Sequence, residues 1–154
     1  MARPVVGPGA DLFNADLSSE DLSNVDLTGA TLSRANLFGT NLSGSLLGGV
    51  RATRINLSRA NLAHANLAGA TLTNANMTNA SLTNANLSGA DLTGANLTGV
   101  VASDSDFTGS NLTRVNFSGA WLLRANLTGA NITGAHFAGA NLSEALMPDG
   151  SVHG

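Results

Sequence analysis

Large apolar residues recur at every fifth position from Leu12 to Met147, and the spacing holds without an insertion or a deletion. Of these 28 central positions, 26 are Leu, Ile, Met or Phe, and the exceptions are Ala52 and Ala102. On an α-helix, five residues would rotate the chain by about 140° beyond a full turn, so the central residues would cover every face. On a continuous strand, an odd spacing would place them alternately on the two faces. All of them can point inward only if the chain turns a corner every five residues.

The residues around each centre complete a five-residue unit. The position two before the centre is mostly Ala, and Asn or Asp precedes the centre directly in 19 of the 28 units. Ser or Thr usually follows the centre, and the last position is rich in Gly, Asn and Arg. Each unit therefore reads as a short extended piece followed by a turn, with the centre and the Ala-type position inside.

A second repeat of twenty residues is superimposed on the first. Gly recurs every twenty residues from Gly29 to Gly129, and Asn recurs in the same way from Asn36 to Asn116. Four units therefore close one square coil, and residues twenty apart stack. Stacked identical amides can form a hydrogen-bonded ladder, which we expect for the Asn column. The 28 units predict an all-β solenoid of seven coils over residues 10–149, about 34 Å long at about 4.8 Å per coil.

Several runs, such as residues 85–89 (ANLSG) and 95–99 (ANLTG), give the unit in its plainest form, A-(N/D)-L-(S/T)-x. This pattern resembles the pentapeptide repeat family over nearly the whole chain. The resemblance implies a right-handed quadrilateral β-helix. We expect an N-terminal lead-in at residues 1–9, a single solenoid domain at 10–149 and a C-terminal tail at 150–154.

Composition excludes several classes of protein. The chain has no Cys, so it contains neither a disulfide scaffold nor a thiolate metal site. Ten acidic residues and seven arginines give a net charge of −3, so we expect no direct binding of nucleic acid, which needs a net basic surface. No apolar run approaches the roughly 18 residues of a membrane span, and none near the start resembles a signal peptide. The expected location is cytoplasmic, without membrane contact.

Residues that could carry catalysis do not converge. His64 and His136 fall on different faces and about 19 Å apart along the rod, too far to share a metal ion. Asp104 and Asp106 flank an inward position, Ser105, which directs the two carboxylates to different sides of a corner. A regular rod also lacks the cleft in which catalysis usually takes place. The sequence therefore predicts no enzyme activity, no cofactor and no metal.

Three departures from the repeat are candidate interaction surfaces. One carboxylate lies on each face of the first coil, three arginines share one face of coils two and three, and three apolar residues are expected outside on another face of coils five and six. Charged residues can serve solubility alone, whereas Trp is enriched at protein interfaces. The carboxylates of the first coil are Asp11, Asp16, Asp21 and Asp26. The arginines are Arg34, Arg51 and Arg54, and the apolar residues are Val101, Trp121 and Leu123.

The ends of the rod should be its weak points. Glu20 occupies an inward position in the first coil, which is tolerable where water reaches the open end. Phe137, Leu142 and Met147 should face solvent unless they are covered, because the tail is too short for a helical cap. Unpaired backbone groups at an open coil edge can form hydrogen bonds with another chain. The family resemblance also implies dimerisation through the C-terminal ends. We therefore predict an end-to-end homodimer through the C-terminal coil, with a side-by-side dimer through Trp121 as the competing arrangement.

Two functions remain open at the level of sequence. The first is a non-catalytic rod for protein interaction or scaffolding, with an unidentified protein partner. The alternative comes from the resemblance: a DNA mimic that binds DNA gyrase and protects it from quinolones or toxins. Duplex DNA of this length carries about 20 negative charges, whereas arginines offset most of the acidic residues here. This mismatch favours the interaction rod.

Overall fold

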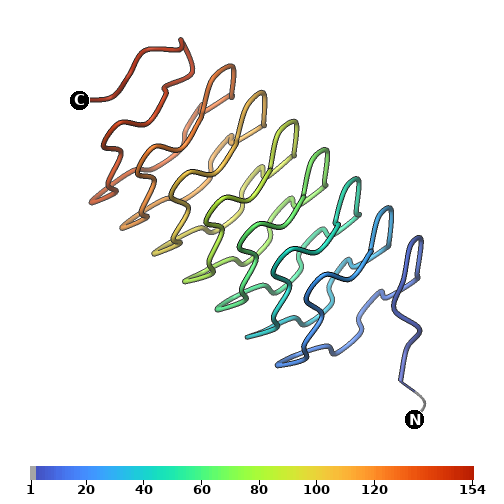
Figure 1. Cartoon of the computed structure of the whole chain (residues 1–154). Coiled ribbons are helices and arrows are strands. Elements are labelled where there is room, and N and C mark those ends of the chain that lie inside the picture. Colours follow the sequence, from blue (N-terminus) through green and yellow to red (C-terminus); the bar gives the residue numbers. More distant parts are fainter. Residues whose placement is uncertain (1–2) are drawn as a thin grey trace.

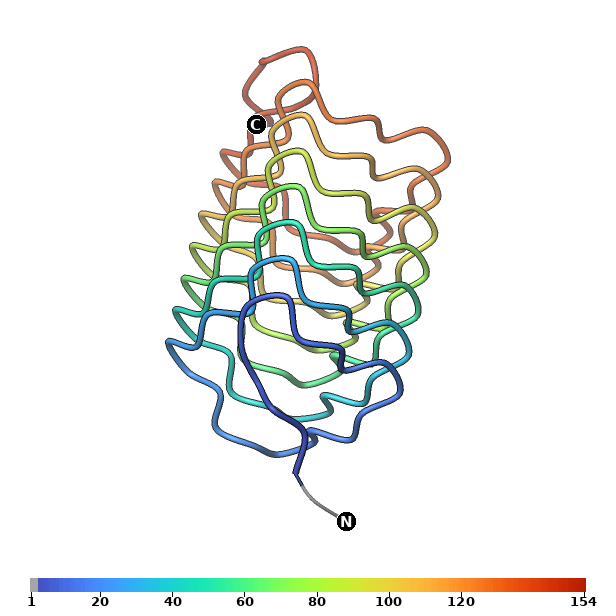
Figure 2. The same ribbon diagram turned by 90° about the vertical axis from the view of Figure 1, so that its right-hand side faces the viewer.

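The chain forms an all-β solenoid, which a computed structural model describes for residues 3–154. Those residues contain no helix, and their β-structure consists of isolated bridges rather than longer strands. Parallel bridges join residues twenty apart, from Asp11↔Thr31 to Asn126↔Leu146, and recur every five residues. They form four ladders along the rod, whose coils are stacked in Figures 1 and 2. The twenty-residue register expected from the sequence is thus confirmed.

Backbone hydrogen bonds explain why the unit has five residues. The Leu87 N–H donates to Asp106 O at 2.7 Å, and the Asp106 N–H donates back to Ala85 O at 2.9 Å, so each extended piece is held by the next coil. The Ala90 N–H donates to Leu87 O at 3.1 Å and closes a turn. One corner therefore follows each extended piece.

The corner requires a left-handed backbone at the last residue of the unit. Gly89 has a φ of 65°, and Arg54 in the corresponding position has a φ of 58°. Gly adopts this conformation without a steric penalty, and Asn tolerates it better than most residues. This conformation explains the enrichment of Gly and Asn there, although Arg occupies the same position in five units, at Arg34, Arg54, Arg59, Arg114 and Arg124.

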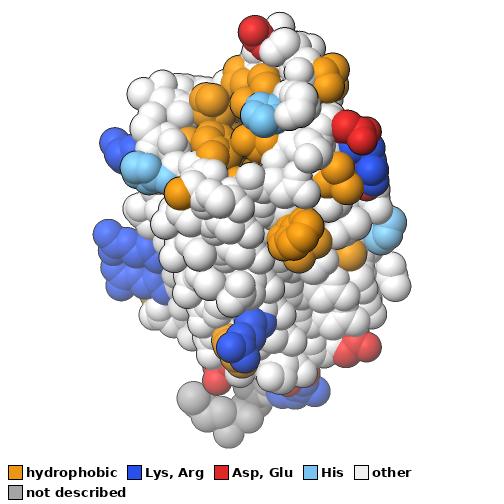
Figure 3. Space-filling view, turned by 90° about the vertical axis from the view of Figure 1, so that its left-hand side faces the viewer, with side chains coloured by type: hydrophobic (Ala, Val, Ile, Leu, Met, Phe, Trp, Pro, Cys, Tyr) orange, Lys and Arg blue, Asp and Glu red, His pale blue; other side chains and the backbone are white. Residues whose placement is uncertain are grey.

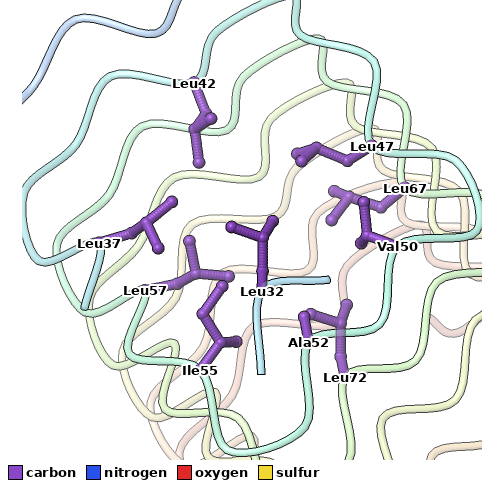
Figure 4. A pocket seen from close by; sticks show the side chains of 10 residues that line it. All are labelled: Leu32, Leu37, Leu42, Leu47, Val50, Ala52, Ile55, Leu57, Leu67 and Leu72. Carbon is purple, nitrogen blue, oxygen red and sulfur yellow. The ribbon is translucent and has the colours of Figure 1, made fainter. Parts of the chain in front are cut away.

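The core is a continuous column of central and Ala-type side chains. Leu87, Phe107 and Phe117 are fully buried, as are most residues of both series. Ala52 leaves less side-chain volume at its centre, and the larger Val50 and Ile55 stand at the neighbouring Ala-type positions (Figure 4). The apolar cavity left there is only about 10 Å³. The core therefore compensates for a small centre with larger residues at the Ala-type positions.

Four Ala-type positions hold buried hydroxyl groups. Ser45 Oγ donates to Leu42 O at 2.6 Å, and Thr40 Oγ1 donates to Leu17 O at 2.7 Å. Ser105 and Ser110 form the same short bond to the carbonyl three residues earlier. Within residues 3–154, no buried side-chain polar atom lacks a partner. These hydroxyls are therefore accommodated in the core by bonding to its backbone.

The expected amide ladder is mostly wrong. Asn56 Nδ2 donates to Asn36 Oδ1 at 3.0 Å, but no such bond joins the later members of this column in the described part of the chain. Instead, Asn76 Oδ1 accepts from the Thr78 N–H at 3.1 Å and from Thr78 Oγ1 at 2.7 Å. At Asn76 the turn supplies two donors to the amide oxygen, whereas Phe38 has no hydroxyl and Asn36 Oδ1 accepts from Asn56 in addition to the Phe38 N–H. Stacking alone therefore does not produce the ladder.

The N-terminal lead-in folds against the first coil. Val6 packs on the end of the core, and Arg3 forms an ion pair with Glu20. Glu20 is half-buried, in agreement with its expected position at a water-accessible end.

The C-terminal end is less open than the sequence suggested. The tail turns back and pairs antiparallel with the last coil, through the bridge Leu146↔Val152. The Met147 N–H donates to Ser151 O at 2.8 Å, and the His153 N–H donates to Ala145 O at 2.8 Å. The tail covers this side without a helix because a short extended segment can form hydrogen bonds with the backbone groups of the exposed edge. An apolar area remains visible near this end of the rod (Figure 3).

Candidate functional site

No catalytic constellation is present in residues 3–154. His64 and His136 are exposed on different sides of the solenoid, and buried Ser105 separates Asp104 from Asp106. The described residues contain no group of three or more His, Asp or Glu side chains placed to hold a metal ion. An open groove of about 350 Å³ lies between the lead-in and the first coil, where its charged lining includes the Arg3–Glu20 pair. The same part of the chain has no helix long and apolar enough to cross a membrane.

Trp121 and Val101 form the core of an exposed apolar surface, which we call the Trp face together with Leu123. Trp121 is 55% exposed and Val101 is 41% exposed. A parallel bridge places them side by side on adjacent coils, and the Ala102 N–H donates to Trp121 O at 2.7 Å. Leu123 is half-buried rather than fully outside. The ladder fixes the backbone beneath the indole, so the surface is preformed.

A charged pair borders the Trp face at the next corner. Arg124 Nε lies 2.7 Å from Asp104 Oδ1, and Arg124 Nη2 lies 2.8 Å from Asp104 Oδ2. The hydrogen bonds from Arg124 lower the pKa of Asp104, and the carboxylate in turn raises the pKa of Arg124. This bidentate pair gives the apolar surface a fixed polar rim.

The four aspartates of the first coil are exposed, one on each side, as predicted. Their Oδ1 atoms accept backbone N–H groups two residues later, as Asp16 does from Ser18 at 3.1 Å. Hydrogen bonds from the Ser18 hydroxyl and then from its backbone N–H lower the pKa of Asp16. These carboxylates therefore have a structural role in the turns, and their role in binding stays a prediction. The full set is Asp11, Asp16, Asp21 and Asp26.

Arg34, Arg51 and Arg54 lie together on adjacent coils, and we call this group the arginine corner. The Arg34 N–H donates to Thr53 O at 3.0 Å, which places Arg34 directly beside the Thr53–Arg54 segment of the next coil. Arg51 Nη2 contacts Thr31 Oγ1 at 3.3 Å. Within residues 3–154, the ion pairs are Arg3–Glu20 and Arg124–Asp104, so none of these three guanidinium groups has a carboxylate partner there.

Two exposed aromatic residues were not recognised as surface features from the sequence. Phe13 is 51% exposed and Phe38 is 41% exposed, and both follow a centre, where Ser or Thr is usual. The guanidinium carbon of Arg59 lies 5.8 Å from the centroid of the Phe38 ring, within the range of a cation–π contact. The departure from Ser or Thr was the signal that could have identified both residues.

The candidate dimer end retains a partly uncovered edge. Phe137, Leu142 and Met147 are half-buried, and Phe137 stacks on Phe117 with ring centroids 5.2 Å apart. Within the described residues, the backbone N–H groups of Ile132, Phe137 and Leu142 have no backbone acceptor. The tail therefore covers only part of this edge.

Solved structures with the same repeat resemble the chain. HetL from the cyanobacterium Nostoc sp. strain PCC 7120, a pentapeptide repeat protein involved in heterocyst differentiation regulation, is 29% identical; the match covers 94% of this chain and 90% of HetL, with a TM-score of 0.44. A trypsin-treated variant of QnrB1, a plasmid-mediated fluoroquinolone resistance protein, is 22% identical; the match covers 92% of this chain and 85% of that one, with a TM-score of 0.50. The QnrB1 likeness shows the fold alone.

Comparison with curated protein sequences gives no match. A family model described as pentapeptide repeats matches in 8 copies, over residues 9–44, 40–79, 55–94, 75–114 and 110–147. These matches span nearly the whole solenoid and coincide with the five-residue units that form its coils. The chain therefore belongs to the pentapeptide repeat family.

Proposed function

We propose that this chain is a non-catalytic interaction rod that binds a protein partner through the Trp face. Proteins of this family are generally structural or interaction proteins rather than enzymes. The observation that carries the proposal is the exposure of Trp121, beside Val101, on a rod whose other outward positions are mostly small or polar. A partner that covered about 100 Å² of this apolar surface would gain about 2.5 kcal/mol. Because hydrogen bonds between the coils already hold the backbone, this surface would lose little conformational entropy on binding.

The proposal includes three features expected from the sequence, one of which, the handedness of the coil, is implied by the family resemblance. The coil is right-handed and four-sided, with seven turns over residues 10–149. Residues 1–9 and 150–154 are the lead-in and the tail of this single domain. The protein acts in the cytoplasm.

Protection of DNA gyrase by duplex mimicry is the alternative function. It follows from the family resemblance and from the rod shape. The charge layout supports it less well, because the aspartates of the first coil encircle one end instead of following one side of the rod. Asp104 is also neutralised by Arg124. A duplex mimic needs a continuous negative track, since the partner site evolved for evenly spaced phosphates.

Site-specific photo-crosslinking tests the proposed contact. A benzophenone amino acid in place of Trp121 should give a discrete crosslinked product in cells that produce this protein. The matched control is the same probe in place of Asn61, which is exposed on the same ladder but lies outside the Trp face. A product that contains a gyrase subunit would support the alternative function. Equal crosslinking from both positions, or none from position 121, would contradict the Trp face as a binding surface.

The homodimer prediction can be checked separately by light scattering. Met147→Asp should convert an end-to-end dimer to monomer, because it places a carboxylate at the partly covered C-terminal edge. Trp121→Ala should leave that dimer intact. Loss of the dimer only in Trp121→Ala would instead support side-by-side pairing, and a monomeric wild type would refute both arrangements.

A further inference from the structure

We propose that the arginine corner is a binding site for an acidic protein segment that carries a few closely spaced carboxylates. The site lies on another side of the rod from the Trp face, so the inference does not depend on the function proposed for that face. Figure 3 shows a dense arginine group at the left edge of the rod.

The three arginines lie on neighbouring segments of adjacent coils, and none of them forms an ion pair within residues 3–154. Arg34 and Arg54 occupy the same corner on consecutive coils, and Arg51 projects from the unit that ends in Arg54. Arg3 and Arg124, by contrast, each have a carboxylate partner. Like charges on neighbouring segments repel one another, and an anion bound between them reduces that repulsion. A bound carboxylate would remove that repulsion and would accept two parallel N–H bonds from a guanidinium fork.

The backbone conformation fixes the corner positions of two of these arginines. Arg34 and Arg54 have φ values of 60° and 58°, in the left-handed region that disfavours most side chains. The other members of this corner column are Asn14, Asn74, Gly94, Arg114 and Gly134, so Arg34 and Arg54 are its two arginines on consecutive coils. Arg34 and Arg54 therefore lie at neighbouring corners of adjacent coils, where their like charges repel one another. A ligand that needs both charges accounts for this arrangement.

The charge along the face limits the length of the ligand. The outward ladder through Arg51 reads Asp11, Thr31, Arg51, Thr71, Asp91 on successive coils. A carboxylate thus lies two coils away in each direction, about 10 Å from Arg51. A nucleic acid lying along the rod would face these carboxylates as well as the arginines. A compact acidic peptide can contact the arginines alone, which favours a protein segment over a polynucleotide.

Residues at equivalent positions of the repeat indicate which substitutions should remove the charge of each arginine and keep the fold. Arg34→Gly and Arg54→Gly introduce the residue preferred at a left-handed corner, and Arg51→Thr copies its ladder neighbours Thr31 and Thr71. The matched control is Arg114→Gly, since Arg114 occupies the same corner column with a φ of 57° but lies away from the cluster.

Fluorescence anisotropy with a labelled hexaglutamate peptide tests the site. We expect saturable binding at low salt that weakens as ionic strength rises. The triple variant should bind about tenfold to a hundredfold more weakly, because each exposed ion pair contributes up to about fivefold. Arg114→Gly and Trp121→Ala should change the affinity by less than about twofold. Preserved affinity in Trp121→Ala separates this site from the Trp face.

Three results would overturn the proposal: no saturable binding of hexaglutamate at low salt, an equal loss of affinity in Arg114→Gly, or tighter binding of a short DNA duplex than of the peptide. Circular dichroism of the triple variant should match the wild type. A change in its spectrum would assign these arginines a structural role and would likewise contradict the proposal.

Discussion

Replacing Ala80 by Glu should reduce the free energy of unfolding by about 3 to 5 kcal/mol, the usual range for an unpaired buried charge. Ala80 is fully buried in the middle of the rod. The carboxylate would be surrounded by apolar side chains, without a cation or a free donor to compensate for lost hydration. Urea unfolding of the variant and the wild type measures the difference.

Two controls separate position and charge in this experiment. Glu20→Ala alters the same inward column at the N-terminal end, where Glu20 is half-buried and paired with Arg3, and should change stability little. Ala80→Gln adds nearly the same volume without the charge.

Burial should raise the pKa of the introduced carboxyl above its usual value of about 4.3, so the folded form holds a proton that the unfolded form releases. Stability should therefore fall as pH rises through that window, and a pH-independent loss equal to that of Ala80→Gln would contradict the argument.

Truncating Leu87 to Ala should destabilise the protein by about 2 to 5 kcal/mol. Leu87 is fully buried, and its backbone is held by bonds to the next coil, so the coil cannot collapse to fill the space. The loss of stability has two parts: the transfer free energy of the removed methyl and methylene groups, and the cost of the cavity that they leave. Denaturant unfolding gives the magnitude.

Thr93→Ala is the comparison for Leu87→Ala. Thr93 lies on the outside, where its hydroxyl donates to Asp91 Oδ1 at 2.6 Å. Loss of this partly solvated bond should change stability by about 1 kcal/mol or less. Similar losses for the two variants would mean that the inward and outward positions are wrongly assigned.

The sequence was sufficient to determine the coil because a five-residue spacing has few ways to bury its leucines. Once a corner follows every unit, the central and Ala-type residues are inside and residues twenty apart are stacked. The neighbours Val101 and Trp121 follow from this register, as does the row that contains Arg51. The departures that define the candidate surfaces could be located in the same way, because each replaces a residue expected from the repeat.

The tertiary structure alone decided which of several possible partners each polar group takes. Stacking brought the Asn side chains together, yet Asn76 bonds to Thr78 in its own turn, because the local donors are already within reach. Only the folded geometry shows Arg59 over Phe38. The tail has no repeat to reveal its path, and its antiparallel pairing depends on the backbone groups left unpaired where the last coil ends. Periodicity specifies which residues are neighbours, whereas competition among nearby donors and acceptors selects the bonds between them.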